Sequence, residues 1–326
     1  MIGAKRLCLA VAITACQIVA LSAAHAATYY VRPGGNNAND GLSWATAWAH
    51  PNRAQSQFTA SGHTLVIAPG SYDTVQFVPP AAGGAQTVYA CSSWAASGSD
   101  AGRNNTFIRG GRNQNLTWTS IGGNRWTTTF DSPGGGVVSN NGEYVAFFRD
   151  GVTMRPRQSA GELDEQNEYS YNTSGGLTTL YSTTNPNSST WRVCWRPVMF
   201  LGRNQSNVMI YGLNIQEGSQ RLFILTESGS GMPKCDSIYI YHCNLSKVSD
   251  LQIAHNTSII YCGEIGPSSV SDWSNAIEVV GCSLSTVISV GEGTGVHAGS
   301  AIEYYFTRDS RIDSNVFVGP MSVAIA

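Results

Sequence analysis

The residues best able to do chemistry in this sequence gather between positions 217 and 255. Glu217 and Lys247 occupy equivalent places in two related segments, and Arg221, Asp250 and His255 lie close to them in the chain. A basic side chain can abstract a proton from a carbon next to a carboxylate when a nearby cation stabilises the developing charge. We therefore take Lys247 as a candidate catalytic base, Arg221 as a carboxylate-binding cation and His255 as a further catalytic candidate.

Each of these candidates has a structural alternative. A Glu217–Lys247 pair on neighbouring strands could be an exposed salt bridge, which is usually worth little. A loop histidine such as His255 is more often solvated than catalytic. Asp250, like Asp272, could ligate calcium, but neither belongs to a D-x-D pattern. Beside these alternatives, we predict Asp250 as a metal ligand, Glu217 as a substrate-binding residue and calcium as the possible cofactor.

Short repeated strands would have to position these residues. The segments NVMIYGLNI, DSIYIYHCNL, NAIEVVGCSL and DSRIDSNVF share one alternating pattern that breaks at a small or polar residue and then resumes. Aligned copies give three columns: Ile210, Ile240, Val279 and Ile312; Leu213, Cys243, Cys282 and Asn315; and Ile215, Leu245, Leu284 and Phe317. His242 precedes the second bend. The pattern predicts pairs of strands joined by a tight bend with the same face inward each time.

One copy cannot bury its apolar face alone, so the repeats predict a stacked β-solenoid. The alternative, an antiparallel sandwich, would show turns every 8–12 residues or so without recurring columns. Identical side chains stack favourably at such a bend, as asparagine ladders do. Cys243 and Cys282 share the bend column and could form a stack of buried thiols or a disulfide.

The pattern of the first 26 residues predicts a secretory signal peptide. Lys5 and Arg6 precede an apolar run, and Ala24-His25-Ala26 is a small-x-small cleavage pattern. The alternative is an uncleaved anchor. Of the 19 Lys and Arg residues, 17 remain after cleavage against 21 Asp and Glu, which gives a formal charge of −4. We expect a secreted, periplasmic or cell-surface monomer without a membrane span, and this acidic balance argues against a nucleic-acid partner.

The segment after the signal predicts a cap for the solenoid. A strand such as TYYV can cover the open edge of the sheet, and Trp44 and Trp48 can plug the apolar channel. Pro51 begins a possible short helix that extends to Ala60.

Two of these segments support a resemblance to a known family. YYVRPGGNNANDGLSWATAW and SGHTLVIAPGSY resemble the N-terminal cap and first coil of bacterial right-handed parallel β-helix proteins of the pectate-lyase-like superfamily. RIDSNVF resembles that superfamily's Asn-containing coil motif. The resemblance implies an all-β fold: an N-terminal cap at 27–62 and a right-handed parallel β-helix at 63–326, with a β-rich insertion at about 112–200.

The resemblance also implies an exported carbohydrate-active protein. We expect a lyase-like β-elimination on a uronate-containing polysaccharide; the alternative is a non-catalytic glycan-binding or adhesin-type protein, because this fold hosts many activities. The sequence lacks the Asp-Asp pair of the related hydrolases. Trp191 and Trp195 could bind sugar by stacking or could belong to the core of the insertion. The chain ends directly after a coil, so we expect a truncated product or an exposed last coil.

Overall fold

The protein, seen here as a computed structural model, is described over fifteen stretches. These are residues 26–58, 62–80, 85–130, 145–157, 159–172, 176–194, 198–201, 205–217, 221–225, 236–248, 260–262, 274–287, 302–304, 307–308 and 310–318. The predicted signal peptide lies outside them except for Ala26. Within these stretches no helix combines the length and the apolar character needed to cross a membrane.

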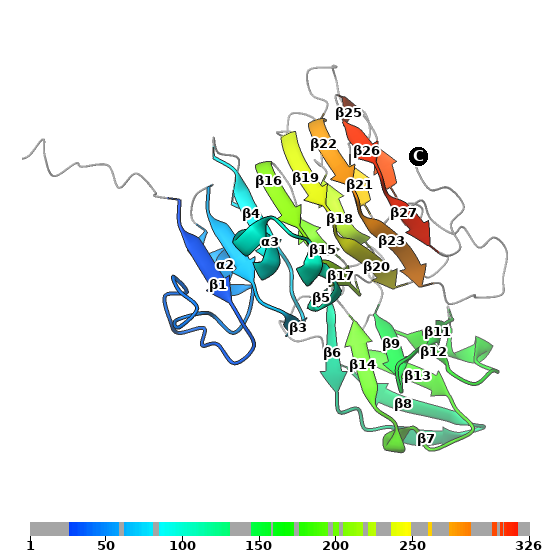
Figure 1. The fold of residues 1–326 in the computed structure, drawn as a ribbon. Helices are drawn as coiled ribbons and strands as arrows, with labels where there is room; N and C mark the ends of the chain where they lie inside the picture. The colour runs from blue at the N-terminus through cyan, green and yellow to red at the C-terminus, as the bar shows by residue number, and fades with distance from the viewer. Residues whose placement is uncertain are drawn as a thin grey trace, which may run out of the picture.

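Three parallel sheets form the main body (Figure 1). Sheet A contains β1 (Thr28–Val31), β2 (Thr64–Ile67), β4 (Thr87–Cys91), β16 (Ser206–Tyr211), β19 (Asp236–Tyr241), β22 (Ser274–Val280), β25 (Thr307–Arg308) and β26 (Arg311–Asp313). Sheet B contains β3 (Gly70–Tyr72), β5 (Thr106–Arg109), β17 (Asn214–Gln216), β20 (Asn244–Val248), β23 (Ser283–Val287) and β27 (Val316–Val318). Sheet C contains β15 (Val198–Leu201), β18 (Arg221–Leu225), β21 (Ile260–Cys262) and β24 (Ile302–Tyr304).

The chain visits the three sheets in a fixed order. From β15 onward it passes from sheet C to sheet A and then to sheet B, and each return adds a strand beside the previous one. Parallel neighbours require such crossovers. The protein is therefore an all-β structure of stacked coils.

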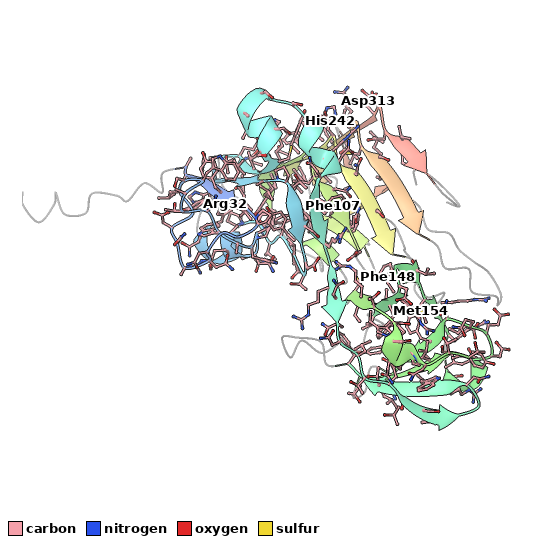
Figure 2. All side chains as sticks on the ribbon, turned by 60° about the horizontal axis from the view of Figure 1, so that its bottom comes forward. Arg32, Phe107, Phe148, Met154, His242 and Asp313 are labelled. Atoms are coloured by element: carbon pink, nitrogen blue, oxygen red, sulfur yellow. The ribbon has the colours of Figure 1, made fainter. Side chains whose placement is uncertain are left out.

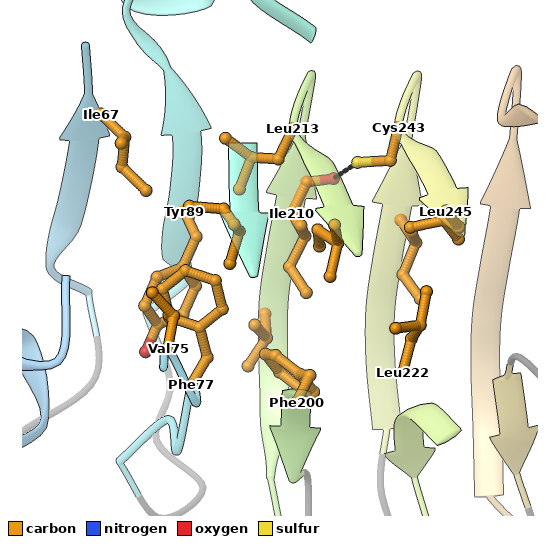
Figure 3. Close-up of a cluster of buried hydrophobic side chains, with 14 of the residues drawn as sticks. Ile67, Val75, Phe77, Tyr89, Phe200, Ile210, Leu213, Leu222, Cys243 and Leu245 are labelled. Atoms are coloured by element: carbon orange, nitrogen blue, oxygen red, sulfur yellow. Dashed lines mark hydrogen bonds between the residues drawn. The ribbon is translucent and has the colours of Figure 1, made fainter. Parts of the chain in front are cut away.

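The predicted columns are confirmed by the strand register. In sheet A, Ile210 pairs with Ile240, which pairs with Val279, and Val279 pairs with Ile312. In sheet B the same holds for the column Ile215, Leu245, Leu284 and Phe317. The period-2 alternation places these side chains on one face in every coil. They form a single apolar core between the sheets together with Leu213, Leu222 and Phe200 (Figure 3).

The bend between sheets A and B carries the predicted column of Leu213, Cys243, Cys282 and Asn315. Asn315 accepts a hydrogen bond from the backbone N–H of Cys282 at 2.8 Å and donates its own side-chain N–H to the carbonyl of Val279 at 2.8 Å. Cys243 and Cys282 are buried free thiols, and Cys243 Sγ lies 3.9 Å from the carbonyl oxygen of Ile210 (Figure 3). The thiol-stack alternative is therefore the one found, and burial raises the pKa of the Cys243 thiol.

The N-terminal segment covers the first coil. β1 pairs with β2 in parallel, and the fully buried Trp48 stacks on Tyr29 at 4.8 Å between ring centroids. The plug predicted for two tryptophans is confirmed for Trp48 and is wrong for Trp44. Trp44 is 40% exposed and contacts Tyr30, because the polar loop carries it outward. The helix α2 (Arg53–Gln57) is shorter than the predicted one.

Two further sheets lie between β5 and β15. One contains β6 (Gly111–Gln114), β9 (Ala146–Arg149), β10 (Val152–Thr153) and β14 (Trp191–Cys194). The other contains β7 (Thr119–Gly122), β8 (Arg125–Thr129), β11 (Arg155–Pro156), β12 (Glu168–Tyr171) and β13 (Leu177–Tyr181). Nearly all their pairings are antiparallel, and they enclose a core of their own, which includes Phe147 and Met154. This insertion projects to one side of the coils (Figures 1 and 2).

A buried carboxylate holds part of the insertion together. Glu168 is 0% exposed. Its carboxylate accepts hydrogen bonds from Nε of Arg157 at 2.7 Å and from the backbone N–H groups of Asp164 and Glu165, each at 3.0 Å. Burial by itself would raise the pKa of Glu168, but these donors outweigh it and hold the pKa below its ordinary value.

We expect Glu168→Gln to destabilise the protein by about 3 kcal/mol near neutral pH, because it removes the charge of a fully buried carboxylate on which Arg157 and two backbone N–H groups converge. A lowered pKa makes this stabilisation complete above the ordinary glutamate pKa and removes it as the pH falls through the lower folded-state pKa. Thermal melting at several pH values should therefore show a gap between wild type and variant that narrows in acid. The exposed Glu165→Gln is the control, and an equal loss there would contradict the account.

Candidate functional site

The structure describes only some of the residues predicted from sequence. Glu217 and Trp191 are described with their side chains, whereas for Lys247 and Arg221 the backbone alone is described. Trp195, Asp250 and His255 lie outside the described residues. The predicted catalytic roles of Lys247, Arg221 and His255 and the predicted metal role of Asp250 therefore stay predictions.

Lys247 lies in β20, where it pairs with Thr286 of the next coil. Glu217 lies just beyond the end of β17, and its backbone N–H donates to the carbonyl of Ser246 at 3.0 Å. Its φ of 65° turns the chain out of the strand. The carboxylate of Glu217 turns toward the insertion, where it contacts Arg192. Arg221 begins β18 and pairs with Val198 in sheet C.

Arg192 of β14 connects the insertion to the coils. Its Nη2 donates to Glu217 at 2.7 Å, to Asp73 at 2.9 Å and to the carbonyl of Gly111 at 2.9 Å, while Nε contacts Glu217 at 2.8 Å. Burial would lower the pKa of Arg192, but its two carboxylate partners raise it. Nε and both terminal nitrogens of this guanidinium have protein acceptors, so the cluster fits a structural joint better than a substrate site.

Trp191 belongs to the core of the insertion. It is 3% exposed, its ring centroid lies 4.9 Å from that of Trp118, and its indole N–H donates to the carbonyl of Pro186 at 3.0 Å. A ring with both faces packed offers no surface to a sugar. For Trp191 the structure thus favours the core interpretation over substrate binding.

A second cluster of ionisable groups lies at the bend between sheets A and B, around His242. Four equivalent bend residues have positive φ: Gly212 at 63°, His242 at 53°, Gly281 at 66° and Ser314 at 55°. Left-handed backbone is costly for a residue with a large side chain. His242 is thus the bulky exception in a column of small residues.

The neighbouring glycine makes room for this imidazole. A Cβ atom at Gly281 would lie 2.8 Å from Nδ1 and 2.9 Å from Cε1 of His242. The ring therefore lies over the next bend, and 42% of the side chain remains exposed. The site has an exposed imidazole in a position that the backbone fixes.

Asp100 and Arg103 face His242 from a different part of the chain. After β4 the chain forms α3 (Ser92–Ser97) and the 3-10 helix η1 (Ala101–Asn104) before it enters β5. Asp100 Oδ2 lies 3.5 Å from Nδ1 of His242 and 3.3 Å from Nη1 of Arg103. Arg103 Nη1 also donates to the carbonyl of Gly281 at 3.4 Å. An imidazole, a carboxylate and a guanidinium thus meet at one bend.

Aromatic rings flank this cluster on the outer face of sheet A. The ring centroid of Tyr211 lies 5.2 Å from that of His242 and 5.7 Å from that of Trp94. Burial, followed by the nearby charge of Asp100, raises the pKa of Tyr211. Tyr241 donates its hydroxyl to Glu278 at 2.6 Å, and burial together with this hydrogen bond raises its pKa. Both phenols are therefore protonated donors at neutral pH.

This arrangement fits acid–base chemistry on an anionic ligand. No described residue bonds Nε2 of His242 or accepts from Nε or Nη2 of Arg103. The imidazole can accept a proton through Nε2 while Asp100 holds the other side of the ring. The Nε–Nη2 edge of the guanidinium can bind a carboxylate with two parallel hydrogen bonds.

The comparisons with known proteins concern the fold. No family model and no curated protein matches the chain. A solved structure described as a glycoside hydrolase aligns with a TM-score of 0.50 and 10% identity, over 88% of this chain and 77% of that one. XylC in complex with xylose gives a TM-score of 0.45 at 10% identity, over 91% of this chain and 66% of that one. A rhamnogalacturonan lyase gives 0.28 at 11% identity, over 92% and 60%. The chain thus spans less than two thirds of the last two.

Proposed function

We propose that this protein is an exported carbohydrate-active enzyme that cleaves a uronate-containing polysaccharide by β-elimination. The observation that carries the proposal is the meeting of His242, Asp100 and Arg103 at one exposed bend, where no residue of the described stretches bonds Nε2 of the imidazole or the Nε–Nη2 edge of the guanidinium. The fold resembles that of a glycoside hydrolase. Fold likeness alone does not fix an activity, so the chemistry of the site supports the proposal.

In the proposed reaction Arg103, His242 and Asp100 each have one role. Arg103 binds the uronate carboxylate and stabilises the charge that develops on it. His242 takes the proton from the carbon next to that carboxylate through Nε2, and Asp100 stabilises the resulting imidazolium. The electron pair of the broken C–H bond forms the new double bond. The C–O bond to the leaving sugar breaks, and the leaving oxygen takes a proton from solvent.

Lys247 remains the alternative base. It lies in β20, the strand that follows the His242 bend, so either residue could serve a polysaccharide bound near this part of the coils. Arg221, His255 and Trp195 keep their predicted roles as part of this alternative.

Calcium does not fit either described cluster. The carboxylates of Asp73 and Glu217 contact Arg192, and Asp100 contacts Arg103. A calcium ion needs several oxygen ligands that are not already neutralised by a cation. Within the described residues no group of three or more His, Cys, Asp or Glu side chains could hold a metal ion. Asp250 is the remaining proposed ligand.

The handedness of the coils, the export of the protein and its monomeric state are also proposals. We infer that the coils wind right-handed, because parallel crossovers are right-handed in nearly all proteins. We also infer export through the N-terminal signal and function as a monomer.

The second candidate function is glycan binding without catalysis. The half-buried rings of Tyr211, Tyr239 and Tyr241 on the outer face of sheet A favour it, because sugars stack on such rings.

Absorbance of the unsaturated-uronate band separates the two functions. The folded protein is incubated with pectate, alginate and chondroitin, with and without calcium. We expect the absorbance to rise on at least one of them. Retention of a polysaccharide without any rise in absorbance would support binding alone and would contradict the lyase proposal.

A further inference from the structure

Aromatic side chains continue from His242 across neighbouring strands of the outer face of sheet A. We define the aromatic strip as Trp94, Tyr211, Tyr239 and Tyr241. Tyr239 and Tyr241 alternate along β19 with Ile238 and Ile240, which are fully buried. The period of a strand therefore directs both tyrosines outward, and their ring centroids are 5.7 Å apart.

The strip lies partly along one coil, where Tyr239 and Tyr241 belong to β19, and partly across neighbouring coils. Tyr211 pairs directly with Tyr241 in the next coil, and neighbouring strands are about 4.8 Å apart. Trp94, from the α3 segment, extends the strip on the far side of Tyr211. The next coil places Glu278 beside Tyr239. Figure 2 labels His242 at this edge of the coils.

Polar groups accompany the rings along the whole strip. Tyr211 donates its hydroxyl to the carbonyl of Gly98 at 3.3 Å, and Tyr241 donates to Glu278. The guanidinium of Arg103 lies beside Asp100 and donates to the carbonyl of Gly281, in the coil that follows His242. A sugar needs an aromatic face for its C–H groups and polar groups for its hydroxyls and carboxylate, and the strip supplies both.

We propose that a uronate-containing glycan chain binds along the aromatic strip on the outer face of sheet A, with the bond to be cleaved at His242. His242 lies at the bend beyond the paired Tyr211 and Tyr241, so all four rings of the strip bind sugar units on the sheet A side of the cleaved bond. The proposal rests on the proposed function for the choice of a uronate glycan and for the position of cleavage at His242. It adds the path of the chain and the residues that bind units remote from the cleaved bond.

Binding of oligosaccharides of defined length tests this path. The probes are oligomers of three to eight units prepared from pectate and from alginate, and calorimetry is done in a His242→Gln background so that the probes stay intact. We expect affinity to rise with chain length. Tyr239→Ala and Trp94→Ala should each weaken binding of the longer oligomers about fivefold and that of the trimer less, since each ring serves remote units.

Trp44→Ala is the matched control. Trp44 is an exposed ring on the N-terminal loop that contacts Tyr30 of β1. β1 is the edge strand of sheet A, and β2 and β4 separate it from β16, which carries Tyr211, so removal of Trp44 should leave all affinities unchanged. Equal affinities for wild type, Tyr239→Ala and Trp94→Ala would overturn the strip, as would an equal loss in Trp44→Ala or the absence of binding to every probe. If the wild-type protein cleaves the polysaccharide but the strip variants bind the oligomers as well as their parent does, only this inference is overturned. If the strip variants bind more weakly but the wild-type protein produces no unsaturated uronate, only the lyase proposal is overturned.

Discussion

Replacing His242 by glutamine is expected to lower the rate of polysaccharide cleavage by about a hundredfold or more. A positioned general base typically contributes 10²–10⁴ in rate, roughly, and glutamine cannot take the proton. The amide is close to imidazole in size, so the bend and the neighbouring Gly281 should tolerate it. Initial rates under saturating substrate, with thermal melting as a check of folding, measure the effect.

Two further variants separate His242 from its neighbours. Lys247→Ala should leave the rate close to that of wild type if His242 is the base. Asp100→Asn should lower the rate less than His242→Gln, because Asp100 orients the ring and stabilises its charged form without touching the substrate. A large loss in Lys247→Ala with none in His242→Gln would assign the base to Lys247.

Replacing Arg192 by methionine is expected to destabilise the protein by about 3 kcal/mol. The change leaves Glu217 and Asp73 without the cation that they share, and breaking a largely buried ion pair typically costs roughly 3–5 kcal/mol. Glu217 is 13% exposed and Arg192 15%, so water can compensate for little of the loss. Thermal or urea unfolding measures the change.

The same variant should also loosen the insertion, because Arg192 is the residue of β14 that contacts carboxylates of the coils. Limited proteolysis should cut the insertion faster in Arg192→Met than in wild type. Arg311→Met is the control, since the Arg311–Asp313 pair is exposed and such pairs are worth less than about 1 kcal/mol. Equal stability of Arg192→Met and Arg311→Met would show that the joint is not structural.

Much of the coil architecture was predictable because it depends on local alternation. A residue such as Ile240 is placed inward by its neighbours in sequence and then paired by the next repeat. The shared bend column of Cys243, Cys282 and Asn315 followed from the same alignment, whereas the choice between free thiols and a disulfide did not. The position of Trp44 was not predictable in this way, because its ring lies on a loop that does not repeat.

The candidate site was harder to predict because its residues come from distant segments. Asp100 and Arg103 precede His242 by about 140 positions, and nothing in the repeats indicates that α3 and η1 cross that bend. One signal was available: aligned bends read Gly212, His242, Gly281 and Ser314, so the imidazole breaks a run of small residues. Glu217 was expected near Lys247 from its column, but its carboxylate contacts Arg192, which belongs to the insertion.

The most direct test of the central claim is the mass of the products formed in water enriched in heavy oxygen. Elimination breaks the sugar chain without adding water, so the account predicts products whose masses sum to that of the substrate and contain no heavy oxygen. Half of the products should carry a new double bond, and their formation should depend on His242. Products that gain one heavy-oxygen water per cleavage would show hydrolysis and would contradict the account.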